Sequence, residues 1–154
     1  MELRVEWGRI VGLKDDRDLV YSMNLAKLPC RPGVYVFGRR WGNGFEALYV
    51  GKGISIRNRV KGQFNNLRLM QHIKNAKTGK RILVAGQINT KPGQQTTKCL
   101  KLIERGLIRY FLSEGHDLVN KQGTRIRRHE IASSGKHPKK FIPHLMYVEK
   151  RKGE

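Results

Sequence analysis

The chain has 154 residues, of which 38% are hydrophobic, so it is long enough to bury one core and too short for a second full domain. Lys and Arg number 32 against 12 Asp and Glu, and the resulting charge of +20 favours a polyanionic partner, nucleic acid first. No apolar run has the length of a membrane span and MELRVEW does not open a signal peptide, so we expect no membrane partner and an intracellular location, cytoplasmic or nucleoid-associated. Cys30 and Cys99 lack the C-x-x-C spacing of zinc sites, and both are expected to be ordinary packed thiols.

The N-terminal half of the sequence predicts short strands, one helix and a hairpin. Strand-like residues extend to Leu13, and 17–28 has the spacing of a short helix. Runs of β-branched and aromatic residues then predict strands over about 33–39 and 45–51. Asn43-Gly44 is a hairpin signal between them, so these two strands should be antiparallel.

The second half predicts mainly helices. Apolar residues spaced four apart indicate a helix over 54–64, another helix can continue over 66–76, and RILVAGQI (81–88) alternates like a third strand. A long amphipathic helix covers 98–115, where Gly115 is the stop signal. Beyond it come the basic stretch RIRRH, a flexible segment ASSGKHPKK and a final apolar run FIPHLMYV.

One acidic residue stands out in the basic part of the chain. Acids and bases balance over residues 1–30, so the whole excess of +20 arises later, and we do not expect the N-terminal arm to be the nucleic-acid surface. Glu104 is the only acid between Ala47 and Ser113, and it falls inside the apolar stripe of the long helix. That stripe consists of Leu100, Ile103, Leu107, Ile108 and Phe111. A carboxylate there either pairs with a buried Arg or Tyr hydroxyl, or belongs to a functional site.

Two short motifs and three later residues resemble the GIY-YIG nuclease family. The motifs are Pro32-Gly33-Val34-Tyr35 and Leu48-Tyr49-Val50-Gly51-Lys52, and an Arg, a Glu and an Asn follow in the family's order. The resemblance covers about residues 30–121 and implies an α+β fold, with a small three-stranded antiparallel sheet flanked by helices. Residues 1–29 would then form an N-terminal strand and helix extension, and 122–154 a basic C-terminal extension packed on the same domain.

The resemblance also implies an activity. Members of the family are metal-dependent endonucleases, so we expect hydrolysis of phosphodiester bonds in double-stranded or branched DNA, with one divalent cation (Mg²⁺ or Mn²⁺) and no covalent enzyme intermediate. Glu104 would be the single protein ligand of that metal, since Mg²⁺ commonly takes one or two carboxylates and completes its shell with waters and phosphate oxygens. The alternative is a catalytically weak or inactive module that binds DNA or RNA on the same scaffold. The sequence does not distinguish a homing, restriction or repair role.

The catalytic set implied by the resemblance is Tyr35, Tyr49, Lys52, Arg59, Glu104 and Asn120. Tyr49 would deprotonate or orient the attacking water with help from Tyr35, and its phenol needs nearby cations to favour the phenolate. Without the motif, Tyr35 is better explained as a core aromatic with its hydroxyl satisfied, and Lys52 as a solvated surface charge. Asn120 would bond the phosphate or support the site, although an Asn at this point is also typical of a turn.

Arg57 and Arg59 compete for the role of stabilising charge on the phosphate. Arg59 lies at the edge of the apolar face of its helix and at the family's usual distance after Tyr49, so it is preferred. Arg57 points toward solvent on the same projection and is expected to touch the nucleic-acid backbone. Gln63 stands where many relatives carry a Tyr or His; it can hold a water or a phosphate oxygen but cannot usefully transfer protons.

Two basic clusters are further candidates for nucleic-acid contacts. Arg39, Arg40 and Trp41 crown the predicted hairpin, where Trp41 would stack on or wedge at a base. The second cluster consists of Arg125, Arg127 and Arg128. For any single one of these residues, a solvated surface position is the plainer interpretation. The five histidines show no ligand spacing, so we expect no zinc.

Overall fold

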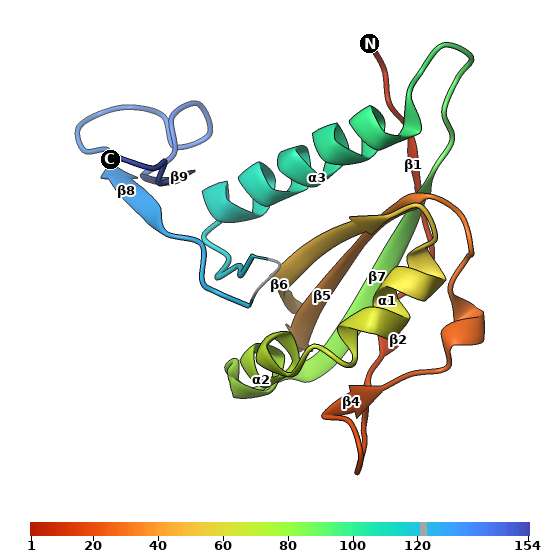
Figure 1. Ribbon diagram of the computed structural model, residues 1–154. Coiled ribbons are helices and arrows are strands. Elements are labelled where there is room, and N and C mark those ends of the chain that lie inside the picture. The colour runs from red at the N-terminus through yellow and green to blue at the C-terminus, as the bar shows by residue number, and fades with distance from the viewer. Residues whose placement is uncertain (121–122) are drawn as a thin grey trace.

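The computed structural model describes residues 1–120 and 123–154 and combines helices with antiparallel sheets (Figure 1). The main sheet contains β1 (Val5–Trp7), β2 (Val11–Gly12), β5 (Gly33–Trp41), β6 (Gly44–Gly53) and β7 (Lys80–Ile88). The α-helices are α1 (Ile56–Gln63), α2 (Leu67–Asn75) and α3 (Thr96–Ser113). This confirms the α+β class. None of the helices among these residues is long and apolar enough to cross a bilayer.

The main sheet has β7 in its interior and β6 at one edge. β7 pairs with β5 on one side and with β1 and β2 on the other, while β5 also pairs with β6, and every pairing is antiparallel. The sheet therefore has five strands and not the three that the resemblance implied, because the first residues of the chain add two short strands along β7. The antiparallel pairing of β5 with β6 confirms the predicted hairpin.

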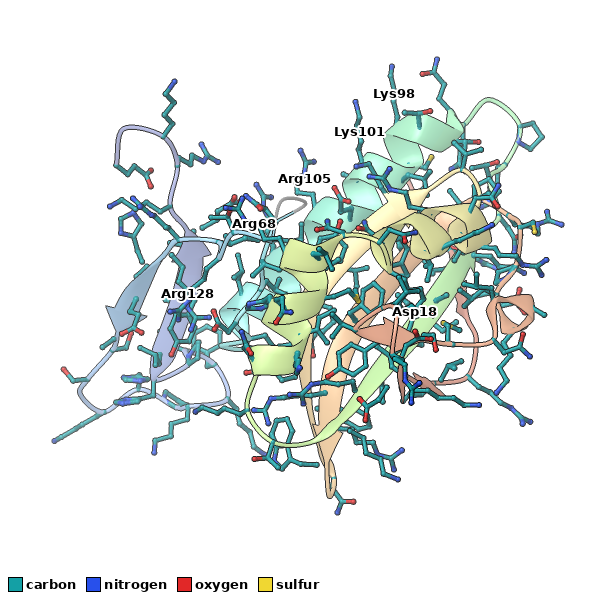
Figure 2. The ribbon with its side chains drawn as sticks, turned by 60° about the horizontal axis from the view of Figure 1, so that its bottom comes forward. Asp18, Arg68, Lys98, Lys101, Arg105 and Arg128 are labelled. Atoms are coloured by element: carbon teal, nitrogen blue, oxygen red, sulfur yellow. The ribbon has the colours of Figure 1, made fainter. Side chains whose placement is uncertain are left out.

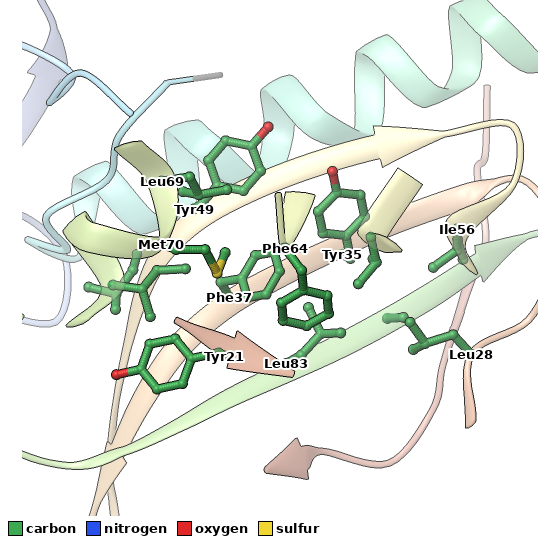
Figure 3. Packing of buried hydrophobic residues seen from close by; sticks show 14 of the residues in the cluster. Tyr21, Leu28, Tyr35, Phe37, Tyr49, Ile56, Phe64, Leu69, Met70 and Leu83 are labelled. Atoms are coloured by element: carbon green, nitrogen blue, oxygen red, sulfur yellow. The ribbon is translucent and has the colours of Figure 1, made fainter. Parts of the chain in front are cut away.

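The helices cover the two faces of the sheet separately (Figure 1). α1 and α2 pack on one face, where the largest core cluster includes Tyr35, Phe37 and Tyr49 (Figure 3). α3 packs on the other face, where its Leu100 joins a cluster with Val34 of β5. Side chains alternate between the faces along a strand, so the neighbours Val34 and Tyr35 serve different layers.

Helix α3 closely matches the helix predicted from the sequence. It ends at Ser113, and Gly115 has a φ of 85°, the left-handed conformation common just after a helix C-terminus. Its predicted apolar stripe packs on the sheet. Lys98, Lys101 and Arg105 project outward from the same helix (Figure 2).

The β5–β6 hairpin contains a tight turn and a bulge. Its two-residue turn is Gly42-Asn43, one position earlier than predicted, and Gly42 has a φ of 51°. The register shifts after Phe37, because Phe37 lies opposite Tyr49 whereas the next residue lies opposite Ala47. Leu48 is thus the extra residue of a bulge, and it joins the same core cluster as Tyr49. Simple alternation, which would place Leu48 and Tyr49 on opposite faces, is wrong at this point.

The predicted helix over 17–28 is also wrong. Oδ1 of Asp16 accepts hydrogen bonds from the backbone N–H groups of Asp18 and Leu19, both at 2.9 Å, and the chain turns back on itself. β3 (Lys14–Asp15) consequently pairs with β4 (Tyr21–Ser22), and only the 3₁₀ helix η1 (Leu25–Lys27) follows. Leu19, Tyr21, Met23 and Leu25 pack on the core at every second residue, as in an extended chain, and Val20 and Leu28 also contact it.

The C-terminal part forms a hairpin beside the end of α3. β8 (Arg128–Ala132) pairs antiparallel with β9 (Leu145–Glu149), and the predicted flexible segment lies in the connection between them. Nη1 of Arg128 donates to the carbonyl oxygen of His116 (2.7 Å), which ties the hairpin to the residues just after α3. The proposed domain boundary between 121 and 122 lies outside the described residues. Cys30 is exposed and Cys99 is buried, so only the second is a packed thiol.

Candidate active site

Tyr35 and Tyr49 lie side by side on the face of the sheet covered by α1 and α2. Both rings are about 1% exposed or less, and their centroids are 6.2 Å apart. Gly51 lies opposite Tyr35 in the register, and a Cβ atom there would come within 2.3 Å of the Tyr35 ring. The glycine of the second motif therefore leaves the space that Tyr35 occupies. Figure 3 shows both hydroxyls pointing the same way, whereas the hydroxyl of Tyr21 in the same cluster points elsewhere.

Gln63 connects the two tyrosine hydroxyls. Its side-chain Nε2 donates to the hydroxyl oxygen of Tyr35 at 2.8 Å and to that of Tyr49 at 3.1 Å. Its Oε1 lies 3.5 Å from Nδ2 of Asn66, and Oδ1 of Asn66 accepts from the backbone N–H of Leu69 at the start of α2. Since the N-cap bond leaves Asn66 with its amide nitrogen facing Gln63, the orientation of the Gln63 amide is set by the helix terminus.

Burial decides the protonation state of the tyrosine pair. It raises the pKa of Tyr35 well above the usual value of 10 and also raises that of Tyr49. The hydrogen bonds from Gln63 and the positive charge of Arg59 lower both pKa values, but they do not overcome burial. The expectation that nearby cations would favour a Tyr49 phenolate is therefore not met in the free protein. Both residues are neutral phenols at neutral pH.

Lys52 and Glu104 form an ion pair between β6 and α3. Nζ of Lys52 is 3.1 Å from Oε1 of Glu104, and the two side chains are 17% and 15% exposed. α3 packs on the face opposite the tyrosine rings, so Glu104 belongs to the other face of the sheet. A site that combines Glu104 with the tyrosines therefore involves both faces. The charge of Glu104 still acts on Tyr49 around the edge strand β6. Burial is the main cause of the raised pKa of Tyr49, and Glu104 adds to it.

The second oxygen of Glu104 bears on the expected metal. Oε2 is buried and has no hydrogen-bond partner within the described parts of the chain. No group of three or more His, Cys, Asp or Glu that could hold a metal occurs among these residues. The donor set thus excludes a cage built by the protein and fits a Mg²⁺ or Mn²⁺ ion bound through one carboxylate, with waters and substrate oxygens in the other positions. Lys52 competes with such an ion for the same carboxylate.

Arg59 and Arg57 have different surroundings on α1. The aliphatic part of Arg59 packs over Gly53, and a Cβ added at Gly53 would lie 2.9 Å from the Cβ of Arg59. The exposed guanidinium of Arg59 lowers the pKa values of both tyrosines. Nε of Arg57 donates to the carbonyl oxygen of Leu28 at 2.9 Å, with Ala26 as a weaker second acceptor at 3.5 Å. Arg57 therefore anchors the N-terminal segment rather than pointing freely to solvent, and Arg59 is the cation beside the phenols.

Asn120 forms a turn and also borders a cavity. Its backbone N–H donates to the carbonyl oxygen of Thr124 (2.8 Å), and its Oδ1 accepts from the backbone N–H of Thr124 (3.1 Å). Glu104 and Asn120 line the same cavity of about 640 Å³. The turn interpretation and a place near the site thus both apply to Asn120, which lines this cavity together with residues of α3.

The first basic cluster divides into one buried and two exposed residues. Nε of Arg39 is 2.9 Å from Oε1 of Glu46, and its Nη1 donates to the carbonyl oxygen of Thr78 at 2.7 Å. Its guanidinium also lies 3.9 Å from the ring centre of Trp41. Arg39 is therefore engaged inside the protein, while Trp41 and Arg40 remain exposed at the hairpin end.

The second cluster divides in the same way. Besides its bond to His116, Arg128 lies with its guanidinium 4.1 Å from the ring centre of Tyr147, so it anchors the C-terminal hairpin. Arg125 is exposed and paired with Asp117 at 2.6 Å, and Arg127 is exposed. Of the three, Arg125 and Arg127 border the cavity that contains Glu104.

Sequence reasoning missed the positioning role of Gln63 and Asn66. Gln63 is buried, so it is not the open contact to nucleic acid that was expected. The available signal was the position of Gln63 on the apolar face of α1, followed by an N-cap Asn three residues later. No protein-family model, curated protein or solved structure matches this chain.

Proposed function

We propose that this protein is a metal-dependent endonuclease that hydrolyses phosphodiester bonds in DNA by direct attack of water, as the resemblance to GIY-YIG nucleases implies. One observation carries the proposal. Residues from β5, β6, α1 and α3 interact in a chain of contacts around β6. Tyr35 and Tyr49 lie side by side, the charges of Arg59 and Glu104 act on Tyr49, and Lys52 pairs with Glu104. Phenols, cations and one carboxylate with a buried unpartnered oxygen are the groups that such a hydrolysis needs.

In this mechanism the phenolate fraction of Tyr49 takes a proton from the attacking water, or the neutral phenol orients that water. Gln63 donates one hydrogen bond to the Tyr49 oxygen, which leaves that oxygen able to accept another from water. Arg59 favours negative charge on the phenol and on the phosphate. When bound at Glu104, Mg²⁺ or Mn²⁺ would supply Lewis-acid activation of the phosphate. Lys52 would then be released from Glu104 to stabilise the developing charge.

The test is nicking of supercoiled plasmid by purified protein with Mg²⁺, with Mn²⁺ and with EDTA. Tyr49→Phe removes the hydroxyl and keeps the buried ring, so it should abolish nicking while the melting temperature stays near that of the wild type. Tyr21→Phe is the matched control, because it removes a hydroxyl from the same core cluster that points away from the pair. The proposal fails if the wild type cuts neither duplex nor branched DNA in either metal.

A binding module is the second candidate, and two observations favour it. Gln63 offers no titrating proton beside the tyrosines, and Lys52 already satisfies one oxygen of Glu104. Such a module would bind DNA or RNA through its basic surface without turnover. It predicts salt-dependent binding by the wild type together with no metal-dependent cleavage on any substrate, which the same plasmid experiment would reveal.

A further inference from the structure

The cavity that Glu104 borders combines an apolar floor with a basic rim. It lies between the second half of α3, residues 119–120 and 124–127, and the end of β9. Its volume of about 640 Å³ falls within the range of ~300–1,000 Å³ that is typical of sites for small ligands. Tyr35, Tyr49 and Gln63 are not among its lining residues, so it shares only Glu104 and Asn120 with the candidate active site.

The floor of this cavity is apolar and comes from three parts of the chain. Val50 of β6 and Val119 are buried, and Ile108 of α3 and Ile126 are half-buried beside them. The backbone N–H of Val119 donates to the carbonyl oxygen of Leu48 at 3.0 Å, which holds this floor against the edge strand. A flat apolar group is therefore the part of a ligand that would lie deepest.

The rim of the cavity is strongly basic. It carries Arg105, Arg109, Arg125, Arg127 and Lys150, against the two acids Glu104 and Glu149. All five cations are exposed, and among residues 1–120 and 123–154 only Arg125 of the five forms an ion pair, with Asp117. A guanidinium can bind phosphate in a bidentate manner or stack on a base, so the rim suits a ligand with both groups.

We propose that this cavity binds an unpaired nucleotide of the substrate strand next to the bond that is cleaved. The base would lie on the apolar floor, and the phosphates would contact Arg109 and Arg127 at the rim. Glu104 lines the cavity, so a strand bound there would lie beside that carboxylate. The assignment of the strand as substrate rests on the proposed nuclease function, whereas the binding itself does not.

A paired nucleotide does not fit this description. In a duplex the bases are stacked and paired, so a protein meets phosphates, sugars and base edges but no free base face, and a double strand would use the rim and leave the apolar floor uncovered. Single strands expose their bases for stacking and insertion. The inferred substrate class is therefore DNA with a single-stranded part, such as a flap, a gap or an open branch.

The test measures binding of a fluorescein-labelled oligothymidine by anisotropy in EDTA, where cleavage is stopped. Arg109→Glu with Arg127→Glu should weaken this binding at least about tenfold, because two phosphate contacts become repulsive. Lys98→Glu with Lys101→Glu is the matched control, since these residues lie on the first half of α3, outside the cavity, and the charge change is identical. The control should bind the oligothymidine within about threefold of the wild type.

A second probe separates base insertion from plain charge attraction. An abasic deoxyribose phosphate strand of equal length carries the same charges without bases, and it should bind the wild type at least about tenfold more weakly than the oligothymidine. Equal binding of the two strands, or equal losses in the two double variants, would overturn the cavity proposal. An oligouridine of the same length serves as the RNA arm, and a clear preference for it would overturn the assignment to DNA.

The outcomes also distinguish this proposal from the proposed function. If the oligothymidine results hold while plasmid and flapped DNA remain uncut in Mg²⁺ and Mn²⁺, the nucleotide site stands and the nuclease proposal fails. If the wild type nicks DNA but Arg109→Glu with Arg127→Glu binds the oligothymidine as well as the control does, the nuclease proposal stands and the site fails.

Discussion

Nζ of Lys52 lies 3.1 Å from Oε1 of Glu104, and this contact joins the edge strand β6 to α3. Both side chains are mostly buried, so each depends on the other for compensation of its charge. The remaining oxygen of Glu104 has no partner in the described part of the chain. A divalent cation bound there, as the proposed function requires, would compete with the ion pair for one carboxylate.

The first prediction separates these two uses of Glu104. Glu104→Gln keeps the shape of the side chain but removes the charge that would bind a cation, so nicking should collapse while DNA binding persists. Loss of the partner for Lys52 should lower the free energy of unfolding by ~1–3 kcal/mol, less than for a fully buried pair because both ends retain some solvent. A variant that still nicks near the wild-type rate would end the proposed mechanism.

Lys52→Met is the complementary variant, and its readout does not depend on activity. Without the ammonium group, Glu104 is available to a cation, so Mg²⁺ should raise the melting temperature of Lys52→Met more than that of the wild type. Glu104→Gln should show no such rise. If Mg²⁺ shifts all three proteins equally, the cation does not bind at Glu104.

The second prediction concerns the bridge between the tyrosines. Gln63→Leu leaves both buried hydroxyl oxygens without their donor, which should cost ~1–3 kcal/mol of stability. It should also raise the pKa of Tyr49 further, because the hydrogen bond from Gln63 lowers that pKa. Ultraviolet titration of tyrosine ionisation measures the second effect, with Tyr49→Phe used to identify the signal. An unchanged titration would show that Gln63 does not tune the pair.

The third prediction follows from the raised pKa values of Tyr35 and Tyr49. Below pH 10 both phenols are neutral in the folded and the unfolded chain, so they give stability no pH dependence there. Above that pH the unfolded chain loses these protons first, so the free energy of unfolding should fall as pH rises. Urea unfolding between pH 8 and 11 tests this, and Tyr35→Phe should flatten the decline.

The rate of cleavage should also depend on pH through the raised pKa of Tyr49. If Tyr49 acts as the base with a raised pKa, the fraction of phenolate grows about tenfold per pH unit throughout the range below 10. The logarithm of the nicking rate should then rise with a slope of ~1 and show no plateau in that range. A plateau near neutral pH would exclude the Tyr49 phenolate of the free protein as the base.

The fourth prediction separates two neighbouring arginines. Arg39 is buried against Glu46 and Thr78, so Arg39→Ala should cost ~2–4 kcal/mol of stability. Arg40 is exposed, so Arg40→Ala should leave stability within ~0.5 kcal/mol of the wild type. If Arg40 contacts one phosphate, its removal should reduce the slope of log affinity against log salt by ~0.9. Equal thermal stability of the two variants would contradict this division.

Local sequence patterns were sufficient for the regular core. The β5–β6 hairpin, α1, α2, β7 and α3 follow from periodicity and from the turn and stop signals at Asn43-Gly44 and Gly115, with the turn itself one position earlier than its signal. Residues 17–28 were misread because Leu19, Val20 and Met23 also fit a helical spacing. The turn held by Asp16, which is a contact between a side chain and the backbone, decided for an extended chain instead.

The candidate site was less accessible to such reasoning. The resemblance supplied Tyr35, Tyr49 and Glu104, but the bulge at Leu48 and the placement of α3 on the opposite face depend on how the layers pack. The engagement of Arg39 and Arg128 inside the protein depends on contacts with residues far along the chain. The sequence alone does not indicate whether a charged residue contacts solvent, nucleic acid or another side chain.

Asn66, at the start of α2, sets the orientation of the Gln63 amide that contacts the tyrosine pair. As an N-cap, an Asp at this position would hold the start of α2 as well as Asn does, yet it would offer Gln63 an acceptor in place of a donor. The Gln63 amide would then rotate so that its nitrogen donates to the Asp and its oxygen faces the phenols. The tyrosine hydroxyls would become the donors in their hydrogen bonds with Gln63. A substitution that leaves the fold and every tyrosine intact could thereby change what the tyrosine pair can do.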